Sequence, residues 1–323
     1  MNALPADLAA VARRMKTERS VALAVHERPD VDALGAAAGM LDLFAQLGVD
    51  AELYVGPGET LPFEALLVPD GARREQPAAG LSLYALDCGS QERIALPRPP
   101  AVVAVNIDHH HDNPRYGEIA FVRGAASSTC ELVCELARAL GLTLSLPAAT
   151  AVYLGISFDS GHFHHSSTSS ATFACAAWLR GLGVDVTAAY AELYEQRSLG
   201  ALRLWGRAVA AASPLAGGRA LVATLRLADY AAAEAGEEET DGIVDSLRGV
   251  GGVEIAALVK EQSRGSRVRV SLRSDAHDVS AIAALQGGGG HRLAAGFSSA
   301  DGPGEVTAWL SSELERCLST ASC

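Results

Sequence analysis

The chain has 323 residues, 49% of them hydrophobic and 20% charged, a balance typical of a globular protein with a substantial core. It contains 26 Lys and Arg residues and 38 Asp and Glu residues, so the net charge at pH 7 is −12. This excess of acid disfavours a protein that wraps long nucleic acid, because such proteins neutralise many phosphates with a basic surface. A small anionic substrate held by metal ions and a few arginines remains compatible with the charge.

Six cysteines are present, but none forms a C-x-x-C pair or a zinc-binding spacing. Cys130 and Cys134 lie one turn apart on a predicted helix, which favours two small buried hydrophobic side chains over metal ligands. Residues 1–19 are charged and lack the apolar core of a signal peptide, and no apolar run is long enough to cross a bilayer. These features predict a cytoplasmic protein with no membrane segment.

The chain begins with an amphipathic helix at residues 6–17 and an apolar strand at 21–25. A strand-to-helix turn follows, and helical spacing of apolar residues resumes at 34–47. The turn contains neither the G-x-G-x-x-G of a dinucleotide site nor a P-loop. It carries instead three side chains that can hold a metal ion: His26, Asp30 and Asp32. Asp32 is also suited to cap the helix.

Two further predicted strands end in acidic side chains. Residues 51–55 and 81–86 have strand character, and Asp87 directly follows the second of these strands. The apolar run 102–105 predicts a short buried strand, and the segment Asn106-Ile107-Asp108-His109-His110-His111-Asp112-Asn113 comes after it. In parallel α/β sheets ligands bind at the carboxyl ends of the strands, so we expect these side chains to meet at one edge. A turn-forming Asp87 and a solvated histidine loop are the alternatives.

Helices are predicted at residues 130–140, 148–156 and 171–182. Ser127 and Ser128 precede the first of them, where Glu131 fits a capping box, and the serine hydroxyls could also bind a phosphate. Asp159 follows the second helix and is a fourth candidate acid. The nearby histidines 162, 164 and 165 fit a solvated loop better than a set of metal ligands.

A long helical stretch at 188–212 ends near Pro214 and Gly217-Gly218, which predicts a domain boundary. Beyond it, strands are predicted at 220–227, 253–260 and 268–272, and helices at 242–247 and 282–285. Basic residues cluster in this part of the chain: Lys260, Arg264, Arg267, Arg269, Arg273 and Arg292. Gly287-Gly288-Gly289-Gly290 then precede a helix-like segment, and backbone N–H groups in such a loop can closely approach an anion.

The candidate ligands in the first part of the chain are carboxylates and imidazoles, with no thiolate: His26, Asp30, Asp32, Asp87, Asp108, His109, His110 and Asp159. This set of donors suits Mn²⁺ best, followed by Mg²⁺ or another first-row ion such as Co²⁺. So many acids at one edge would repel one another without cations, which argues for two ions. Two ions about 4 Å apart clamp a phosphate for in-line attack and make a bound water more acidic.

Four segments, taken in order, resemble the motifs of the DHH phosphoesterase superfamily: His26…Pro29-Asp30-x-Asp32-Ala33-Leu34-Gly35, Asp87, Asp108-His109-His110-x-x-Asn113 and Gly155…Asp159-x-Gly161-x-Phe163. Two later segments resemble the associated DHHA1 domain: Ser271-Leu272-Arg273-Ser274 and Gly288-Gly289-Gly290-His291…Ala294-Ala295-Gly296. The resemblance covers nearly the whole chain. At this length the chain is similar to the NrnA-type nanoRNases and pAp phosphatases, whereas RecJ exonucleases carry additional domains.

The resemblance implies an α/β fold with two domains. An N-terminal DHH domain at 1–186 would contain a mainly parallel five-stranded sheet flanked by helices. A helical linker at 187–217 would lead to a smaller α/β DHHA1 domain at 218–323 with a mixed sheet. The resemblance places one metal on His26, Asp30 and Asp87, and a second on Asp32, Asp87, His109 and Asp159. Asp108 would orient a histidine, and His110 would act at the scissile phosphate as a hydrogen-bond donor or acid.

The resemblance also implies a hydrolase that degrades short oligoribonucleotides to mononucleotides and converts 3′-phosphoadenosine 5′-phosphate (pAp) to AMP. Its substrates would be short RNA or DNA oligonucleotides, linear dinucleotides such as pApA or pGpG, and pAp. The implied substrate-binding residues are Ser271, Arg273, Gly288, Gly289, Gly290 and His291, in addition to Ser127 and Ser128. Three alternatives stay open: a RecJ-like single-strand exonuclease, a pyrophosphatase or exopolyphosphatase, and a non-catalytic nucleotide sensor. The oligomeric state, including a homodimer, is not readable from motifs.

Overall fold

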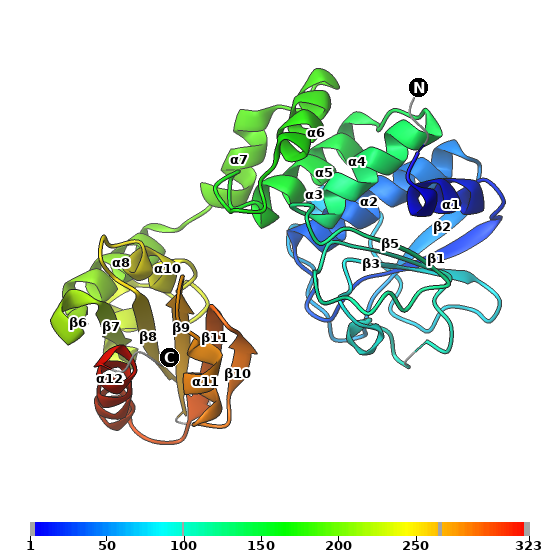
Figure 1. The fold of residues 1–323 in the computed structure, drawn as a ribbon. Helices are drawn as coiled ribbons and strands as arrows, with labels where there is room; N and C mark the ends of the chain where they lie inside the picture. The colour runs from blue at the N-terminus through cyan, green and yellow to red at the C-terminus, as the bar shows by residue number, and fades with distance from the viewer. Residues whose placement is uncertain (1–3, 99, 264–266, 320–323) are drawn as a thin grey trace. The chain divides into compact units, whose positions relative to one another are not determined.

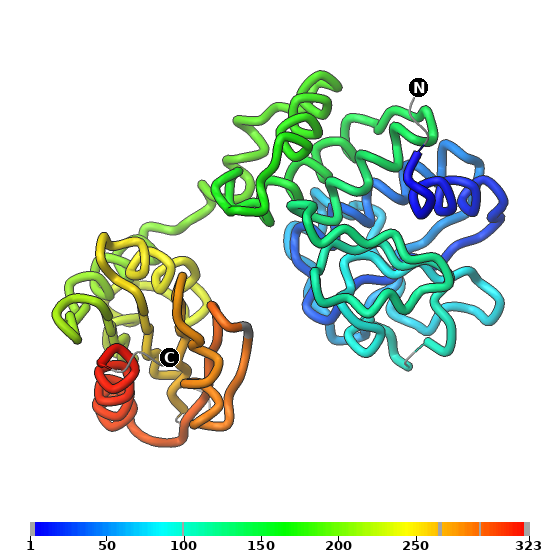
Figure 2. Tube along the Cα trace, in the orientation of Figure 1, coloured from blue at the N-terminus to red at the C-terminus, as the bar shows by residue number. Residues whose placement is uncertain are grey.

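The computed structural model describes residues 4–98, 100–263 and 267–319. The chain divides into two compact units, Met1–Glu195 (unit 1) and Gln196–Cys323 (unit 2). Each unit combines one β-sheet with helices, as Figure 1 and the trace in Figure 2 show. The α/β fold expected from the sequence is therefore confirmed. None of the helices in the described ranges is long and apolar enough to cross a membrane.

Unit 1 is built on a five-stranded sheet in which every neighbouring pair of strands is parallel. The strands lie in the order β2-β1-β3-β4-β5. Their bounds are Ser20–Ala24 for β1, Asp50–Tyr54 for β2, Ser82–Leu86 for β3, Val105–Asp108 for β4 and Ile119–Val122 for β5. The chain order reverses at β1, between β2 and β3, and ligands bind beside such a switch point in open α/β sheets.

Helices cover one face of this sheet. The helices of unit 1 are α1 (Ala6–Met15), α2 (Val31–Gln46), α3 (Glu64–Leu67), α4 (Thr129–Leu140), α5 (Leu146–Asp159), α6 (Ser170–Gly181) and α7 (Val186–Tyr194), with a 3₁₀ turn at Gln91–Arg93. The largest core cluster joins buried side chains of α1, α2, α4 and α5 to one face of β1, β3 and β4. On the other face a smaller cluster packs strand residues against loop side chains such as Ile94 and Val103.

Two central helices of unit 1, α2 and α5, approach each other closely. Gly35 on α2 has no side chain, and a Cβ at that position would lie 2.6 Å from the carbonyl oxygen of Ala151 on α5. At Gly39, one turn further, a Cβ would lie 2.7 Å from Val152. The glycines therefore set the distance between the two helices. This distance matters because α2 carries Asp32 in its first turn and α5 ends at Asp159.

Unit 2 is built on a mixed six-stranded sheet in the order β10-β11-β9-β8-β7-β6. β7 and β8 run parallel, and the other neighbouring pairs of described strands run antiparallel. The strands are β6 (Ser213–Leu215), β7 (Ala220–Leu225), β8 (Ile255–Gln262), β9 (Arg267–Ser274), β10 (Gly289–His291) and β11 (Ala294–Ser299). Core side chains of α8 (Leu199–Ala211), α9 (Leu227–Ala233) and α10 (Ile243–Arg248) pack on one face. Those of α11 (Val279–Ala284) and α12 (Pro303–Ser319) pack on the other.

Some expected elements are wrong in position. The strand expected at 102–105 is β4 at Val105–Asp108, and Val102 is 59% exposed. The pairing of Tyr84 with Val105 sets this register, and Asn106 and Asp108 are buried within the strand because their polar atoms find hydrogen-bond partners. Apolar patterning alone therefore placed the strand three residues too early.

The single helix expected at 188–212 is two helices. Its first part belongs to α7 in unit 1, and its second part to α8 in unit 2. The break falls at residues 195–198, where the hydroxyl of Ser198 accepts a hydrogen bond from the backbone N–H of Ala201 and so caps α8. The domain boundaries at 186 and 217 stay predictions.

The glycine-rich segment is also different from the expectation. Residues 289–299 form an antiparallel hairpin of β10 and β11, and not a loop followed by a helix. The small residues Ala294, Ala295 and Gly296 gave a helix-like pattern, but β11 pairs along its whole length with β9. Pairing between distant segments decided the structure here, as it often does for strands.

Candidate metal centre and active site

The candidate ligands gather at the carboxyl ends of three neighbouring strands. His26 and Asp30 follow β1, Asp87 directly follows β3, and Asp108 is the last residue of β4, with His109 and His110 after it. Two helices complete the group, because Asp32 lies in the first turn of α2 and Asp159 is the last residue of α5. The structure thus brings all eight candidate residues of the first domain to one edge of the sheet.

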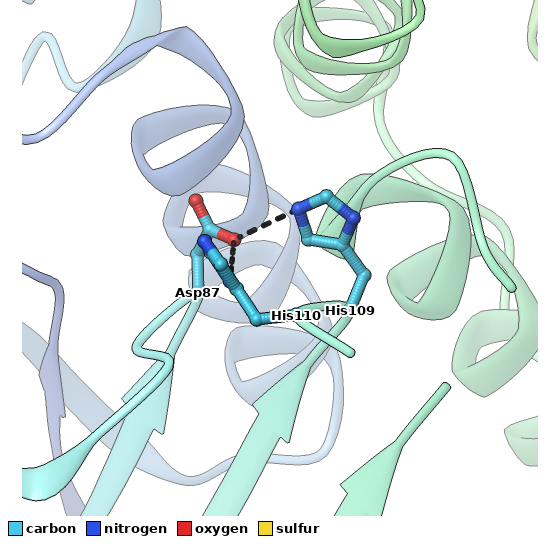
Figure 3. A group of neighbouring side chains, drawn as sticks. All are labelled: Asp87, His109 and His110. Atoms are coloured by element: carbon cyan, nitrogen blue, oxygen red, sulfur yellow. Dashed lines mark ion pairs between the residues drawn. The ribbon is translucent and has the colours of Figure 1, made fainter. Parts of the chain in front are cut away.

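Donor atoms of these side chains form three overlapping groups in which all atoms lie within 4.8 Å of one another. One group is His26, Asp30 and Asp87; a second is Asp32, His109 and Asp159; a third is Asp87, His109 and His110. Asp87 lies between the first two. Its Oδ2 is 3.6 Å from Nε2 of His26, and its Oδ1 is 3.5 Å from Nε2 of His109. Figure 3 shows the Asp87 carboxylate facing both His109 and His110.

His26 and His109 are each held with one ring nitrogen turned toward the acids. Nδ1 of His26 lies 2.8 Å from the carbonyl oxygen of Glu27, and Nδ1 of His109 lies 3.4 Å from that of Ala126. A proton on each Nδ1 satisfies these carbonyls and leaves Nε2 as the free donor atom. This is the usual arrangement of a metal-binding histidine, so the residues fit a divalent cation.

The start of α4 contributes contacts that hold two of the acids. The backbone N–H of Thr129 donates to Oδ2 of Asp32 at 2.7 Å, and that of Cys130 donates to Oδ1 at 3.0 Å. The hydroxyl of Thr129 donates to Oδ1 of Asp87 at 2.9 Å. A helix N-terminus favours negative charge, so α4 stabilises and orients the Asp32 carboxylate. At α2, Asp30 and not Asp32 is the N-cap, since its Oδ1 accepts from the N–H groups of Asp32 and Ala33.

Asp87 adopts an unusual backbone conformation, with a φ of 56°. This left-handed region is uncommon for a residue with a side chain, although aspartate adopts it more readily than most, and such residues cluster at functional sites. The conformation turns the chain directly after β3, while the N–H of Asp87 still donates to the carbonyl oxygen of Ile107 on β4. It places the carboxylate of Asp87 between His26 and His109.

A network behind the centre fixes His110. Oδ1 of the fully buried Asp108 lies 2.8 Å from Nδ1 of His110, and its other oxygen accepts from the amide of Asn113. The same amide contacts Asn106 Oδ1 at 2.9 Å. The histidine that Asp108 orients is therefore His110. Its ring is partly exposed, at 29%, and its Nε2 is free of contacts with this network.

The acids and histidines of the centre shift one another's pKa values. Burial alone would lower the pKa of His26, but contacts with Asp30 and Asp87 raise it to about 10. His109 behaves alike, because Asp159, Asp32 and Asp87 outweigh burial and raise its pKa to about 10. Burial and the charges of neighbouring acids raise the pKa of Asp32 well above its usual value. Without a cation, protons thus occupy part of the ligand set at neutral pH.

Metal binding is therefore expected to release protons. A divalent ion must displace the protons that the raised pKa values of His26 and His109 retain at pH 7. We expect a release of at least about one proton per ion at pH 7, and an apparent affinity that increases with pH. Titration calorimetry in two buffers of different ionisation enthalpy measures this release. A binding enthalpy that is the same in both buffers would contradict the assignment of these histidines.

Ser127 and Ser128 are buried, and their hydroxyls make hydrogen bonds within the protein. The hydroxyl of Ser127 donates to Oε2 of Glu131 at 2.7 Å, and the hydroxyl of Ser128 accepts from the N–H of Glu131. Half of the expected capping box is present, since the Glu131 carboxylate contacts Ser127 and not the N–H of Ser128. These contacts give both serines a structural role, and their binding of phosphate stays a prediction.

The predicted substrate-binding residues of unit 2 lie on β9 and the β10–β11 hairpin. Ser271 and Arg273 are on β9, and Nε of Arg273 donates to Asp245 on α10 at 2.9 Å. A Cβ at Gly290, whose φ is 142°, would lie 2.6 Å from Ala295 Cα, and one at Gly288 would collide with β11; Gly289 has open space. Close packing thus explains two of the glycines. Arg264 and the His291 side chain lie outside the described residues.

Comparison with known proteins decides the family. The chain matches the N-terminal domain of the DHH family at residues 20–156 and the DHHA1 domain at residues 217–320. The bifunctional oligoribonuclease and PAP phosphatase NrnA of Thermus thermophilus is 32% identical over 281 residues, which cover 86% of this chain and 84% of that protein. The chain belongs to the DHH phosphoesterase family. NrnA of Bacillus subtilis is 28% identical over 282 residues, 84% of this chain and 87% of that protein.

Two solved structures share the fold of this chain. An exopolyphosphatase-related protein from Bacteroides fragilis aligns with a TM-score of 0.83 at 20% identity and covers 98% of both chains. RecJ of Thermus thermophilus, solved with Mn²⁺, aligns with a TM-score of 0.52 at 15% identity over 98% of this chain and 55% of that one. At these identities the likeness concerns the fold alone.

As a member of the DHH family, the chain is a hydrolase that acts on phosphoester bonds. Reasoning from sequence missed several side chains that support the centre. Thr129 contacts Asp87, and Tyr116 links Asn106 to the carbonyl oxygen of Cys88. The placement of Thr129 at a helix start was a usable signal, because the N-terminus of a helix attracts acids. Nothing in the sequence marks the role of Tyr116.

Proposed function

We propose that this DHH hydrolase is a two-metal, Mn²⁺-dependent enzyme that degrades short oligoribonucleotides and linear dinucleotides such as pApA and pGpG, and dephosphorylates pAp to AMP. The observation that carries the proposal is the pair of donor groups His26–Asp30–Asp87 and Asp32–His109–Asp159, with Asp87 in reach of both histidines. The names of the relatives from Thermus thermophilus and Bacillus subtilis, oligoribonuclease and PAP phosphatase, support the choice of substrates.

In this proposal each donor group would hold one ion. The bound ions would offset the charge of the phosphoester and acidify a water molecule. The oxygen donors and the Nε2 atoms, without a thiolate, suit Mn²⁺. Asp87 would contact both ions, and its backbone conformation and the hydroxyl of Thr129 hold its carboxylate in that position. Because the carboxylate of Asp87 is already held in place, little reorganisation of the site is needed when the substrate binds.

His110 would act on the substrate itself. Asp108 accepts a hydrogen bond from its Nδ1 and raises the pKa of the imidazole. The raised pKa favours the protonated ring, whose Nε2–H is on the side away from Asp108. That proton would be donated to an oxygen of the phosphoester, and the contact between Asn113 and Asp108 keeps the ring oriented.

The role of unit 2 in this proposal is to bind the remainder of the substrate. Ser271, Arg273, Gly288, Gly289, Gly290 and His291 are the proposed contacts. The net charge of −12 supports short substrates, because a protein that binds a long strand needs many basic contacts to phosphate.

A side-by-side assay with Mn²⁺ tests the proposal. The substrates are pAp, pyrophosphate and 5′-labelled RNA of about two to twenty-four nucleotides, a range from a dinucleotide to a strand whose binding needs many phosphate contacts. A metal chelator serves as the control. We expect turnover of dinucleotides and pAp at least about tenfold faster than of the longest RNA or of pyrophosphate, a difference of about 1.4 kcal/mol in the barrier. Processive degradation of the long RNA would instead identify a RecJ-like exonuclease. Equal release of phosphate from pyrophosphate would identify a pyrophosphatase, and binding of pAp without turnover a sensor.

A further inference from the structure

Unit 2 contains a pair of cations in direct opposition. Lys260 on β8 pairs with Arg269 on β9 in the antiparallel ladder. Side chains that are opposite each other in this way lie about 5 Å apart at Cβ, and like charges there destabilise the sheet. Burial and the charge of the nearby Arg269 both lower the pKa of Lys260.

Among the described residues, no carboxylate forms an ion pair with Lys260 or Arg269. Six other arginines of unit 2 form ion pairs with carboxylates: Arg203, Arg207, Arg219, Arg248, Arg273 and Arg316. Lys260 makes only a 3.3 Å hydrogen bond to the hydroxyl of Thr240, and Asp241 offsets its pKa shift only in part. Two unpaired cations held together in a protein of net charge −12 indicate a place for an anion.

The pair lies on the same face of the sheet as the proposed substrate contacts. Alternation along β9 puts Arg269, Ser271 and Arg273 on one face, while Val268, Val270 and Leu272 are buried in the opposite core. Arg273 contacts Asp245 on α10, and Lys260 contacts Thr240 just before α10, which places both side chains on the α10 face. Arg269 is about 7 Å along the strand from Ser271, a distance that one extended nucleotide unit can span.

The strand next to β9 leaves this face open. On β11, Gly296 is the partner of Ser271 and Ser298 is the partner of Arg269, and on β10 Gly289 is the partner of Gly296. These residues are small, and a Cβ at Gly289 would meet nothing within 4 Å. On the β11 side of Arg269 and Ser271, therefore, no large side chain occupies this face, which leaves room there for a sugar-phosphate chain.

We propose that Lys260 and Arg269 form a second anion subsite, which binds one more phosphate of the substrate beyond the one held by Ser271 and Arg273. The inference rests on the proposed function, because it takes these residues as substrate contacts. It assigns a preference to the enzyme: a substrate with three phosphates, such as pApApA, uses the subsite, and pAp with two does not.

The test measures the ratio of kcat/KM for pApApA to that for pAp in the full-length enzyme with Mn²⁺. We expect Arg269→Gln and Lys260→Gln each to lower this ratio about tenfold, chiefly through KM for pApApA, and Arg269→Lys to restore most of it. The matched control is Arg267→Gln. Arg267 is exposed and lies on the same strand and face, but its partner on β8 is the uncharged Gln262.

Each outcome has one meaning. A ratio that stays at the wild-type value in Arg269→Gln, or falls equally in Arg267→Gln, would overturn the subsite while leaving the proposed function intact. Failure of the wild-type enzyme to cleave either substrate would overturn the proposed function instead. A purely structural role would lower the Tm of Arg269→Gln. The subsite predicts an unchanged or higher Tm without substrate, because the substitution removes one of two opposed like charges.

Discussion

Replacing Asp87 by Asn is expected to lower the rate of phosphoester hydrolysis by about a thousandfold or more. The carboxylate lies within 3.6 Å of Nε2 of His26 and 3.5 Å of Nε2 of His109, so among the described residues it is the acid that contacts both histidines of the proposed metal pair. Asn keeps the size and the hydrogen bond from Thr129, but it loses the negative charge and one oxygen donor. Loss of several kcal/mol of charge stabilisation corresponds to about three orders of magnitude in rate.

Thermal unfolding with and without Mn²⁺ separates this explanation from misfolding. A ligand that binds only the folded state raises stability by about 2.7 kcal/mol at a hundred times its Kd, so wild-type Tm should rise with Mn²⁺. In Asp87→Asn this rise should largely disappear, while circular dichroism reports an unchanged fold. Asp112→Asn is the matched control, because Asp112 is an exposed acid in the loop that follows β4. If Asp87→Asn kept both its activity and its Mn²⁺-dependent Tm, Asp87 would not be a ligand.

The gathering of these acids and histidines at one edge could be predicted from the sequence, because a general rule connects it to the fold. Acids at the ends of parallel strands must meet at one edge, so Asp30, Asp87 and Asp108 could be grouped without coordinates. The rule says nothing about geometry within the group. The left-handed backbone of Asp87 and the choice of Nε2 over Nδ1 in His26 depend on contacts with Ile107 and Glu27 that only the folded chain supplies.

The fold was predicted less evenly, and the errors have physical reasons. Helices such as α2 and α4 were found because their apolar periodicity is local, although the cap of α2 proved to be Asp30 and not Asp32. The strand β4 was misplaced because Asn106 and Asp108 are polar yet buried, satisfied by Tyr116 and His110. Elements set by distant partners were missed or misread, as at the β10–β11 hairpin, where pairing with β9 outweighs the local preference of a small-residue segment.

A packing substitution at Gly35 is expected to disturb the centre almost as strongly as the loss of a ligand. In Gly35→Ala, the new Cβ would lie 2.6 Å from the backbone oxygen of Ala151 and 3.0 Å from Sγ of Cys130. A backbone oxygen within a helix cannot move aside as a side chain can, so α2 and α5 must move apart. We expect a loss of about 2–3 kcal/mol in the free energy of unfolding, a fall in Tm of roughly 5–10 °C.

The same movement separates Asp32 on α2 from Asp159 on α5, which belong to one donor group. A displacement of about 1 Å at a catalytic centre can cost about a hundredfold in rate, so activity should fall by that order even where the protein remains folded. Gly206→Ala is the matched control. Gly206 lies inside α8 with nothing within 4 Å of its Cβ position, so alanine should stabilise it by up to about 1 kcal/mol. If Gly35→Ala kept the wild-type Tm and Mn²⁺ affinity, close contact of the two helices would not be what positions the ligands. If it lost metal affinity while calorimetry still showed a folded protein, the result would support the role of Gly35 in setting the distance between α2 and α5.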